Sequence, residues 1–213
     1  MPIPIATRYW MHGLHIDARD NVWVTDVGRH LAMKFSPEGT LLTTLGTDEV
    51  AGGDATHFNQ PTQVCVTPAG DIYVTDGYGN SRVVRFNARG EFVAAWGSRG
   101  TKPGQFHTPH MITRDAGGRL YVSDRENDRI QVFDESGAVL DVWEGLHSLD
   151  GCMPGRTDSS TPRAASTTRC SGSTARVACW TFGRNLVSSA IRTPLPSVAM
   201  AACSLPKPVT AGR

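Results

Sequence analysis

The amino-acid sequence predicts an all-β fold, built from three four-stranded blades of a β-propeller and followed by a poorly structured C-terminal tail. Three observations lead to this prediction. The same pattern occurs three times at a period of about fifty residues. Each copy contains four short runs of strand-forming residues separated by turn residues. The end of the chain shows neither feature. We therefore divide the 213 residues into a repeat region, 1–146, and a tail, 147–213.

The repeat is defined by residues that recur at nearly fixed spacing. The blades span about 11–46, 61–97 and 109–145, and their aligned first positions are His12, Thr62 and His110. An aspartate follows each first position by fourteen residues, and a phenylalanine follows nine or ten residues later. These residues are Asp26, Asp76 and Asp124, then Phe35, Phe86 and Phe133, with Leu45, Trp96 and Trp143 ten residues beyond. We expect the aspartates to fix the turn between the second and third strands, and the large apolar residues to fill the space between blades.

The strands are clearest in the third unit. Their sequences are HMITR (110–114), RLYVS (119–123), RIQVF (129–133) and VLDVW (139–143). The glycine turns AGG and ESG separate the outer pairs, and DREND turns through aspartate and asparagine, which hydrogen-bond nearby backbone N–H groups. Four antiparallel strands repeated at this period are typical of a propeller blade.

Composition narrows the function classes. No apolar run approaches the roughly 18 residues of a membrane span, and the start MPIPIATRYW lacks the pattern of a secretory signal. Residues 1–150 carry 13 Lys and Arg against 19 Asp and Glu, a negative balance that argues against nucleic-acid binding by the blades. Cys65 is the one cysteine of the repeat region, and we expect it to be a small buried apolar residue.

The innermost strand of each blade lines the central channel of a propeller, so equivalent positions in successive blades form a ring around the axis. His12, Thr62 and His110 share one such ring position. A single histidine at a strand start is usually an ordinary hydrogen-bonded residue. Two histidines at the same position in alternate blades favour a shared function on the axis.

Three longer strings carry a family resemblance: HGLHIDARDNVWVTDVGRH, FNQPTQVCVTPAGDIYVTDGYGNSRVVRF and PGQFHTPHMITRDAGGRLYVSDREN. The pattern resembles the NHL-repeat propellers, and these strings resemble the peptidyl-α-hydroxyglycine α-amidating lyases (peptidylamidoglycolate lyases) over about residues 11–145. The resemblance implies a partial six-bladed β-propeller and an enzyme that cleaves a peptidyl- or acyl-α-hydroxyglycine to an amide and glyoxylate. Its partner would be a small molecule or a peptide C-terminus, without nucleic acid, and the complete protein would be a monomer.

The resemblance also implies roles for particular residues. His12 and His110 would be two of three histidine ligands of a catalytic zinc, a ligand set that leaves one position open. Tyr78 would be the catalytic base, and Arg125 would lie in the active site. The backbone carbonyl of Leu14 would help to hold a structural calcium ion. A non-catalytic NHL-repeat scaffold that binds protein or ligand is the alternative, but it has no need of histidines at alternate ring positions.

The chain departs from the family pattern at both ends. A third ring histidine is expected about a hundred residues after His110, yet no histidine follows His147. The start offers no recognisable preceding blade. We therefore expect a truncated propeller that binds zinc weakly and turns over little or no substrate.

The tail from residue 151 carries 8 Lys and Arg against 1 acidic residue and is rich in Ser, Thr, Ala, Pro and Cys. Such a composition is typical of disorder. The abrupt change favours an out-of-frame reading of the gene. A basic nucleic-acid-binding tail is the competing interpretation, but its arginines are scattered and lack stacking aromatics.

Overall fold

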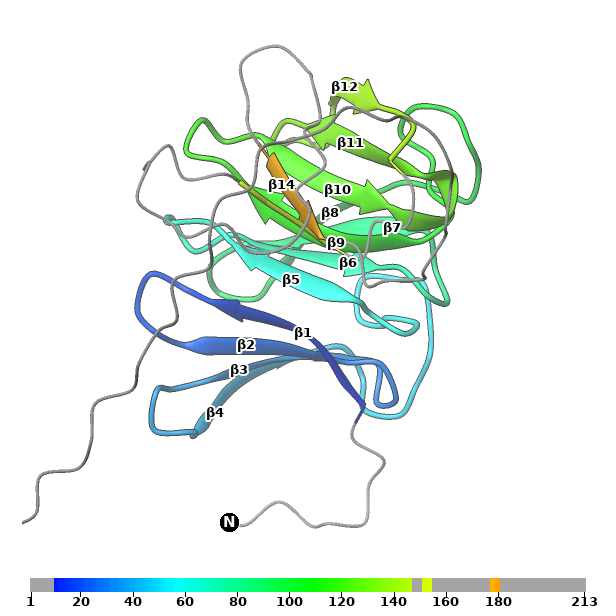
Figure 1. Cartoon of the computed structure of the whole chain (residues 1–213). Helices are drawn as coiled ribbons and strands as arrows, with labels where there is room; N and C mark the ends of the chain where they lie inside the picture. Colours follow the sequence, from blue (N-terminus) through cyan, green and yellow to red (C-terminus); the bar gives the residue numbers. More distant parts are fainter. Residues whose placement is uncertain (1–9, 147–150, 155–176, 181–213) are drawn as a thin grey trace, which may run out of the picture. The chain divides into compact units, whose positions relative to one another are not determined.

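The computed structural model describes residues 10–146, 151–154 and 177–180, and nearly all the regular structure in them is β-sheet (Figure 1). Three four-stranded antiparallel sheets follow one another along the chain, each in sequential strand order. The first contains β1 (Met11–Ile16), β2 (Val22–Asp26), β3 (Leu31–Phe35) and β4 (Leu41–Leu45). The second contains β5 (Gln63–Val66), β6 (Ile72–Asp76), β7 (Arg82–Phe86) and β8 (Phe92–Trp96). The third contains β9 (Pro109–Arg114), β10 (Leu120–Asp124), β11 (Arg129–Phe133) and β12 (Val139–Trp143).

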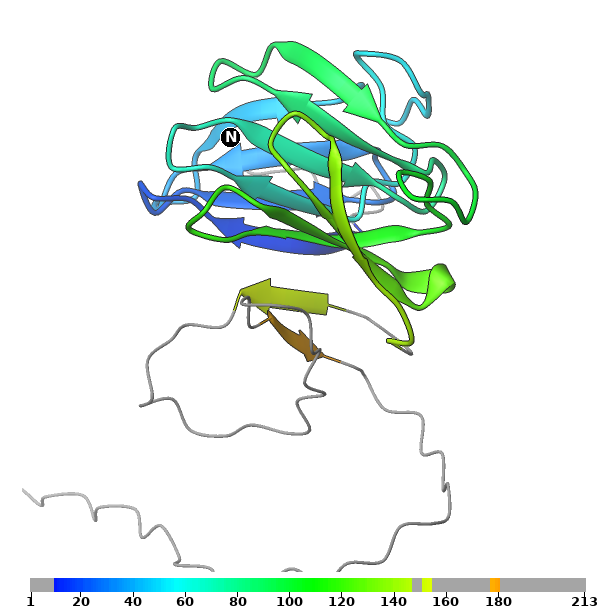
Figure 2. The ribbon, with the colours of Figure 1, turned by 90° about the horizontal axis from the view of Figure 1, so that it is seen from above.

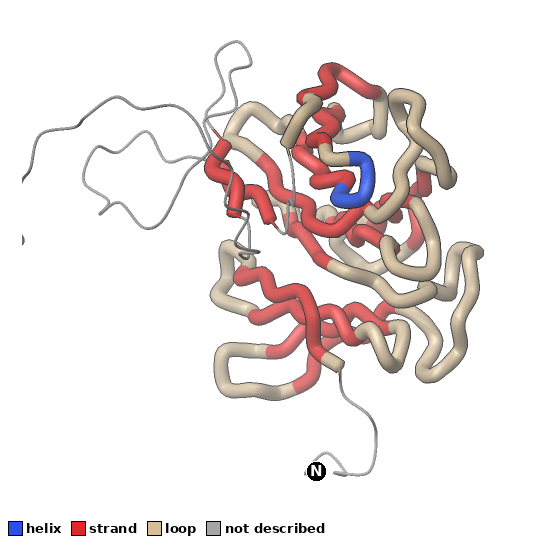
Figure 3. Tube along the Cα trace, turned by 45° about the vertical axis from the view of Figure 1, so that its right-hand side comes forward, coloured by secondary structure: helices blue, strands red, loops and turns tan. Residues whose placement is uncertain are grey.

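The predicted all-β fold of three four-stranded blades is confirmed. The four strands predicted for the third unit are present, and only the ends of β9 and β10 differ by one residue from the prediction. A single turn of 3₁₀ helix, Arg125–Asn127, interrupts the connection from β10 to β11, and it is drawn in blue in Figure 3. No helix of the described residues is long and apolar enough to cross a membrane.

The first strands of the three sheets lie next to one another, because β1 contacts β5 and β5 contacts β9. Figure 2 shows the sheets from above, coloured in chain order. The ring positions predicted from the repeat are therefore brought close together in space.

Two clusters of buried side chains fill the spaces between the sheets. The first joins blades one and two and includes Leu45 and Phe86, and the second joins blades two and three and includes Phe133 with Trp96 packed against it. These four residues occupy repeated apolar positions, so the expectation that such positions fill the space between blades is confirmed for them. Phe35 and Trp143 are only partly buried and belong to neither cluster. Cys65 belongs to the second cluster, and burial raises the pKa of its thiol to about 12, which keeps the thiol protonated and unreactive.

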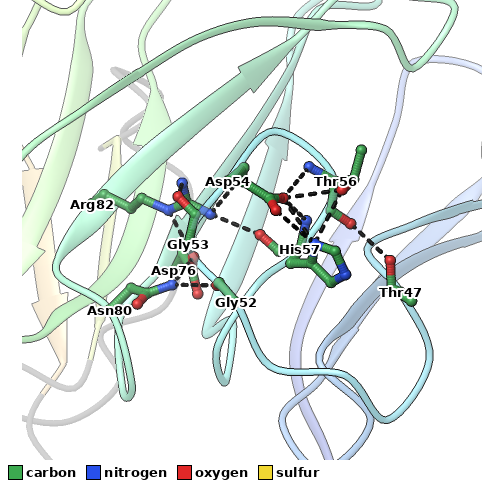
Figure 4. A network of polar contacts seen from close by, with 9 residues as sticks. All are labelled: Thr47, Gly52, Gly53, Asp54, Thr56, His57, Asp76, Asn80 and Arg82. Carbon is green, nitrogen blue, oxygen red and sulfur yellow. Dashed lines mark hydrogen bonds and ion pairs between the residues drawn. The ribbon is translucent and has the colours of Figure 1, made fainter.

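The repeated aspartate has a wider role than the predicted one. Asp76 accepts hydrogen bonds from Asn80 and Arg82 in the turn and strand that follow it, at 2.7 and 2.9 Å. Its other oxygen accepts the backbone N–H of Asn59, from the connection between blades one and two, at 2.8 Å. Arg82 in turn donates to the carbonyls of Gly53, Asp54 and His57 in that connection (Figure 4). The aspartate therefore ties the preceding connection, as well as its own turn, to the blade.

We call this aspartate–arginine pair, which binds the preceding connection, the anchor of the blade. Blade three repeats the anchor, and blade one lacks it. Asp124 accepts from Asn127 and Arg129 at 2.8 Å, and Arg129 donates to carbonyls of the connection between blades two and three. In blade one the residue paired with Asp26 is Leu31. The Oδ1 atom of Asp26 accepts three backbone N–H groups, whereas its buried Oδ2 has no hydrogen-bond partner within the described part of the chain.

The prediction of a poorly structured tail falls mostly on residues that lie outside the described ones. Within the tail, β13 (Gly151–Pro154) and β14 (Val177–Trp180) are described and pair as a two-stranded antiparallel sheet. Sequence inspection did not anticipate these two strands, because each has only four residues and neither belongs to a repeat unit.

Candidate functional site

The two ring histidines meet where β1 and β9 begin. The ring centroids of His12 and His110 are 4.9 Å apart, and the two ring planes are perpendicular. His110 is buried, with 6% of its surface exposed, and His12 is half-buried. Blades one and three therefore place two imidazoles next to each other, although His12 and His110 are almost a hundred positions apart in the sequence.

The hydroxyl of Tyr78 faces both imidazoles. Its hydroxyl oxygen is 2.9 Å from Nε2 of His12 and 3.0 Å from Nε2 of His110. The tyrosine follows β6 directly after Gly77, and a side chain at Gly77 would place Cβ 2.1 Å from the carbonyl oxygen of Pro109. Glycine is therefore required here for β9 to approach the turn that carries Tyr78.

Arg125 completes the group from the start of the 3₁₀ turn. Its guanidinium carbon lies 5.4 Å from the centre of the Tyr78 ring, and Nη1 is 3.4 Å from the Tyr78 hydroxyl. The same guanidinium pairs with Glu126 at 3.0 Å. Burial lowers the pKa of Arg125, but hydrogen bonds to Tyr78 and Glu126 outweigh it and the net shift is upward. The side chain therefore places a permanent positive charge beside the Tyr78 oxygen.

The tautomer of His12 follows from its contact with the backbone. Nδ1 lies 2.7 Å from the carbonyl oxygen of Thr62, which can only accept a hydrogen bond. The proton is therefore on Nδ1, and Nε2 carries the lone pair that faces the Tyr78 hydroxyl. A carbonyl that binds one ring nitrogen of a metal-ligating histidine commonly fixes the other nitrogen for the metal.

The environment of His12 also favours its neutral form. Burial lowers the pKa of His12, the Thr62 carbonyl opposes this effect, and the charge of Arg125 lowers the pKa further. A neutral imidazole is the form that binds a metal ion.

We expect His12 to titrate below the ordinary value of about 6.5. Since the pKa is lower in the folded than in the unfolded state, the unfolded state binds more protons as the pH falls through 6.5. The resulting loss of stability is absent above this pH and grows below it. An NMR titration of the His12 ring in the native and urea-unfolded protein measures both midpoints, and a native midpoint at or above the unfolded one would contradict the assignment.

These residues fit two positions of a zinc site. Both Nε2 atoms point at the same oxygen atom, and His12 holds the tautomer that a metal requires. In the described part of the chain, no group of three or more His, Cys, Asp or Glu side chains is placed to hold a metal ion. Two such imidazoles match two of the three histidine ligands that the family resemblance implies for a catalytic zinc, and zinc binding stays a proposal.

Leu14 lies two residues after His12 with an exposed side chain. Its carbonyl oxygen accepts a hydrogen bond from Nε2 of Gln63 at 3.1 Å, and the buried Oε1 atom of that amide has no hydrogen-bond partner among the residues that the structure describes. Calcium binds six to eight oxygen atoms. The unsatisfied amide oxygen beside the Leu14 carbonyl is compatible with a cation there, and the calcium ion stays a proposal.

The sequence did not reveal two members of the site. The Thr62 carbonyl orients His12, but a backbone group has no residue-type signature. Glu126 pairs with Arg125, and within DREN its role could not be separated from that of an ordinary turn residue. The shared ring position of Thr62 and the histidines was the one available signal.

Comparison with known proteins places these features in a class. The family model described as NHL repeat matches residues 58–86 and 106–133. A solved streptogramin B lyase has a TM-score of 0.51 at 19% identity, over 67% of this chain and 43% of that chain, which supports the fold alone. Residues 58–86 and 106–133 are therefore NHL repeats, and the three sheets have the fold of a partial β-propeller.

Three proteins with similar sequences indicate which NHL-repeat proteins the chain resembles. The peptidyl-glycine alpha-amidating monooxygenase of Mus musculus is 46% identical over 134 residues, 59% of this chain and 14% of that protein. A probable peptidyl-alpha-hydroxyglycine alpha-amidating lyase of Caenorhabditis elegans is 39% identical over 129 residues, 59% of this chain and 37% of that protein. NHL repeat-containing protein 3 of Homo sapiens is 38% identical over 142 residues, 62% of this chain and 40% of that protein.

Within the NHL-repeat proteins, the blades of this chain thus resemble those of an enzyme family that includes the α-hydroxyglycine amidating lyases. The matched segment spans between 14% and 40% of the length of these three relatives.

Proposed function

We propose that this chain belongs to a zinc-dependent lyase that cleaves a peptidyl- or acyl-α-hydroxyglycine to an amide and glyoxylate. The observation that carries the proposal is the convergence of Nε2 of His12 and Nε2 of His110 on the Tyr78 hydroxyl, with Arg125 beside it. The name of the Caenorhabditis elegans relative, a probable peptidyl-alpha-hydroxyglycine alpha-amidating lyase, supports the same chemistry. A scaffold needs neither the paired imidazoles nor a cation against the tyrosine.

The residues would divide the reaction between them. Zinc, when bound by His12 and His110, supplies Lewis acidity to the substrate hydroxyl. Tyr78, as the phenolate after its own proton has passed to solvent, would take the proton of that hydroxyl as the C–O bond becomes the carbonyl of glyoxylate and the C–N bond breaks. The departing amide nitrogen then receives one proton, which Tyr78 can return, so atoms and charges balance. Tyr78 thus acts in turn as general base and general acid.

Arg125 would stabilise negative charge on the substrate and on Tyr78. Its guanidinium can pair with the carboxylate of the α-hydroxyglycine, in a geometry that favours two parallel hydrogen bonds. It also stabilises negative charge on the Tyr78 oxygen once the proton has left.

Calcium at the Leu14 carbonyl would be structural. A substrate bound at the ring by its C-terminal group requires no second protein chain, so we propose a monomer.

The test is zinc-dependent release of glyoxylate from an N-acyl-α-hydroxyglycine. We expect slow release by the unmodified chain, because the described residues supply two zinc ligands rather than three. Tyr78→Phe should reduce the zinc-dependent rate by about 10²- to 10⁴-fold, since loss of general acid–base catalysis has this magnitude. Zinc binding should be retained in this variant.

The non-catalytic scaffold predicts a different result. The human relative is named only for its NHL repeats, and its name indicates no enzymatic activity. Zinc-dependent release of glyoxylate that is lost in Tyr78→Phe would exclude the scaffold. Equal rates for the unmodified chain and Tyr78→Phe would exclude tyrosine as the base.

A further inference from the structure

Each blade carries a buried hydroxyl residue directly before its repeated aspartate. These residues are Thr25, Thr75 and Ser123, and each is fully buried. Each hydroxyl accepts the backbone N–H of the residue that follows the ring position, at 2.8, 3.0 and 2.9 Å for Gly13, Gln63 and Met111. The hydroxyl thus fixes the backbone at the point where the inner strand presents its ring residue.

Thr25 also reaches the next blade. Its hydroxyl accepts from the N–H of Gly13, the neighbour of His12, and donates to the carbonyl of Thr62 at 3.0 Å. The same carbonyl accepts Nδ1–H of His12 at 2.7 Å. One threonine therefore holds both the backbone of His12 and the acceptor that sets the orientation of its ring.

Thr62 extends the connection toward the second histidine. Its buried hydroxyl lies 2.8 Å from the carbonyl oxygen of Pro109, the residue before His110. That contact is the shortest hydrogen bond of the Thr62 hydroxyl, which also lies near Thr75. Thr25 and Thr62 thus link the backbones that carry His12 and His110 by buried hydrogen bonds across three blades.

We propose that Thr25 is a positioning residue, which acts through the Thr62 carbonyl to hold His12 with its proton on Nδ1 and Nε2 free for a ligand. The proposal rests on the proposed function for the identity of that ligand, zinc. The ring orientation itself is a property of the chain alone. Loss of an outer-shell partner of this kind typically costs roughly 10- to 100-fold in metal affinity.

Thr25→Val keeps the shape of the side chain and removes the hydroxyl. In the metal-free protein, ¹⁵N chemical shifts of the His12 ring should change from the Nδ1–H tautomer toward a mixture, and the affinity for Zn²⁺ should fall roughly 10- to 100-fold. Thr25→Ser should restore both. The matched control is Thr67→Val, which removes a buried hydroxyl that accepts the N–H of Asp71 at 3.0 Å, in a turn outside the site.

The control should lower the melting temperature without changing the His12 tautomer. A Thr25→Val protein with the unmodified tautomer and unmodified Zn²⁺ affinity would overturn the proposal, as would equal tautomer changes in Thr67→Val. If the unmodified chain binds no Zn²⁺, the proposed function fails, and the metal-free tautomer still decides whether Thr25 positions His12.

Discussion

Replacing Arg129 with alanine is expected to destabilise the protein by about 3–5 kcal/mol, the cost of breaking a buried ion pair by removing one partner. Arg129 is 5% exposed and Asp124 fully buried, and Nε of Arg129 lies 2.8 Å from the aspartate. The guanidinium also donates to the carbonyls of Lys102 and Gln105. Alanine would leave a buried carboxylate with less compensation and would release the connection between blades two and three.

The matched control is Arg89→Ala. Arg89 pairs with Glu91 at 2.7 Å, but their side chains are 77% and 58% exposed, so solvent screens the pair. Its loss should leave the free energy of unfolding nearly unchanged, because a solvent-exposed ion pair contributes little to stability. Urea unfolding of both variants, followed by far-UV circular dichroism, measures the difference. Similar midpoints for the two variants would show that the buried anchor contributes no more than a surface pair.

This anchor shows what the repeat could and could not predict. The fixed spacing of the aspartates identified residues that hold a turn, and the turns are held as expected at Gly28 and Asn80. The arginine partner also recurs in DGYGNSR and DRENDR, but its acceptors are backbone carbonyls of connections that have no repeated sequence. A carbonyl has no residue-type signature, so only the structure shows how the connections are tied to the blades.

Some residues of the candidate site could be predicted from the repeat, and others only from the family resemblance. Equivalent positions of a repeat must occupy equivalent places in a propeller, so the pairing of His12 with His110 followed from sequence alignment within the chain. Tyr78 and Arg125 lie on turns, where side-chain direction does not follow from strand periodicity, and only the family resemblance pointed to them. The structure adds the distances that join all four residues, together with the Thr62 carbonyl that orients His12.

His110→Ala is expected to abolish zinc binding by the chain. The substitution removes one of two convergent imidazoles, and a single histidine with water in the other positions holds zinc weakly at neutral pH. The loss should exceed the roughly 10- to 100-fold change that accompanies removal of an outer-shell partner. Because a buried ring is lost, the fold must be monitored in parallel by circular dichroism. Isothermal titration with Zn²⁺ measures the affinity.

The control for this substitution lies three residues away. His107 is outside the site and contacts Arg99 at 2.6 Å through its partly exposed ring, so His107→Ala tests loss of an imidazole from the same segment. We expect it to bind Zn²⁺ as the unmodified chain does. His12→Ala should behave like His110→Ala, since each ring supplies one Nε2 to the same point in space. Retained zinc in both ring variants, with the fold intact, would mean that the two imidazoles only share a hydrogen bond with Tyr78 and that the metal is held elsewhere.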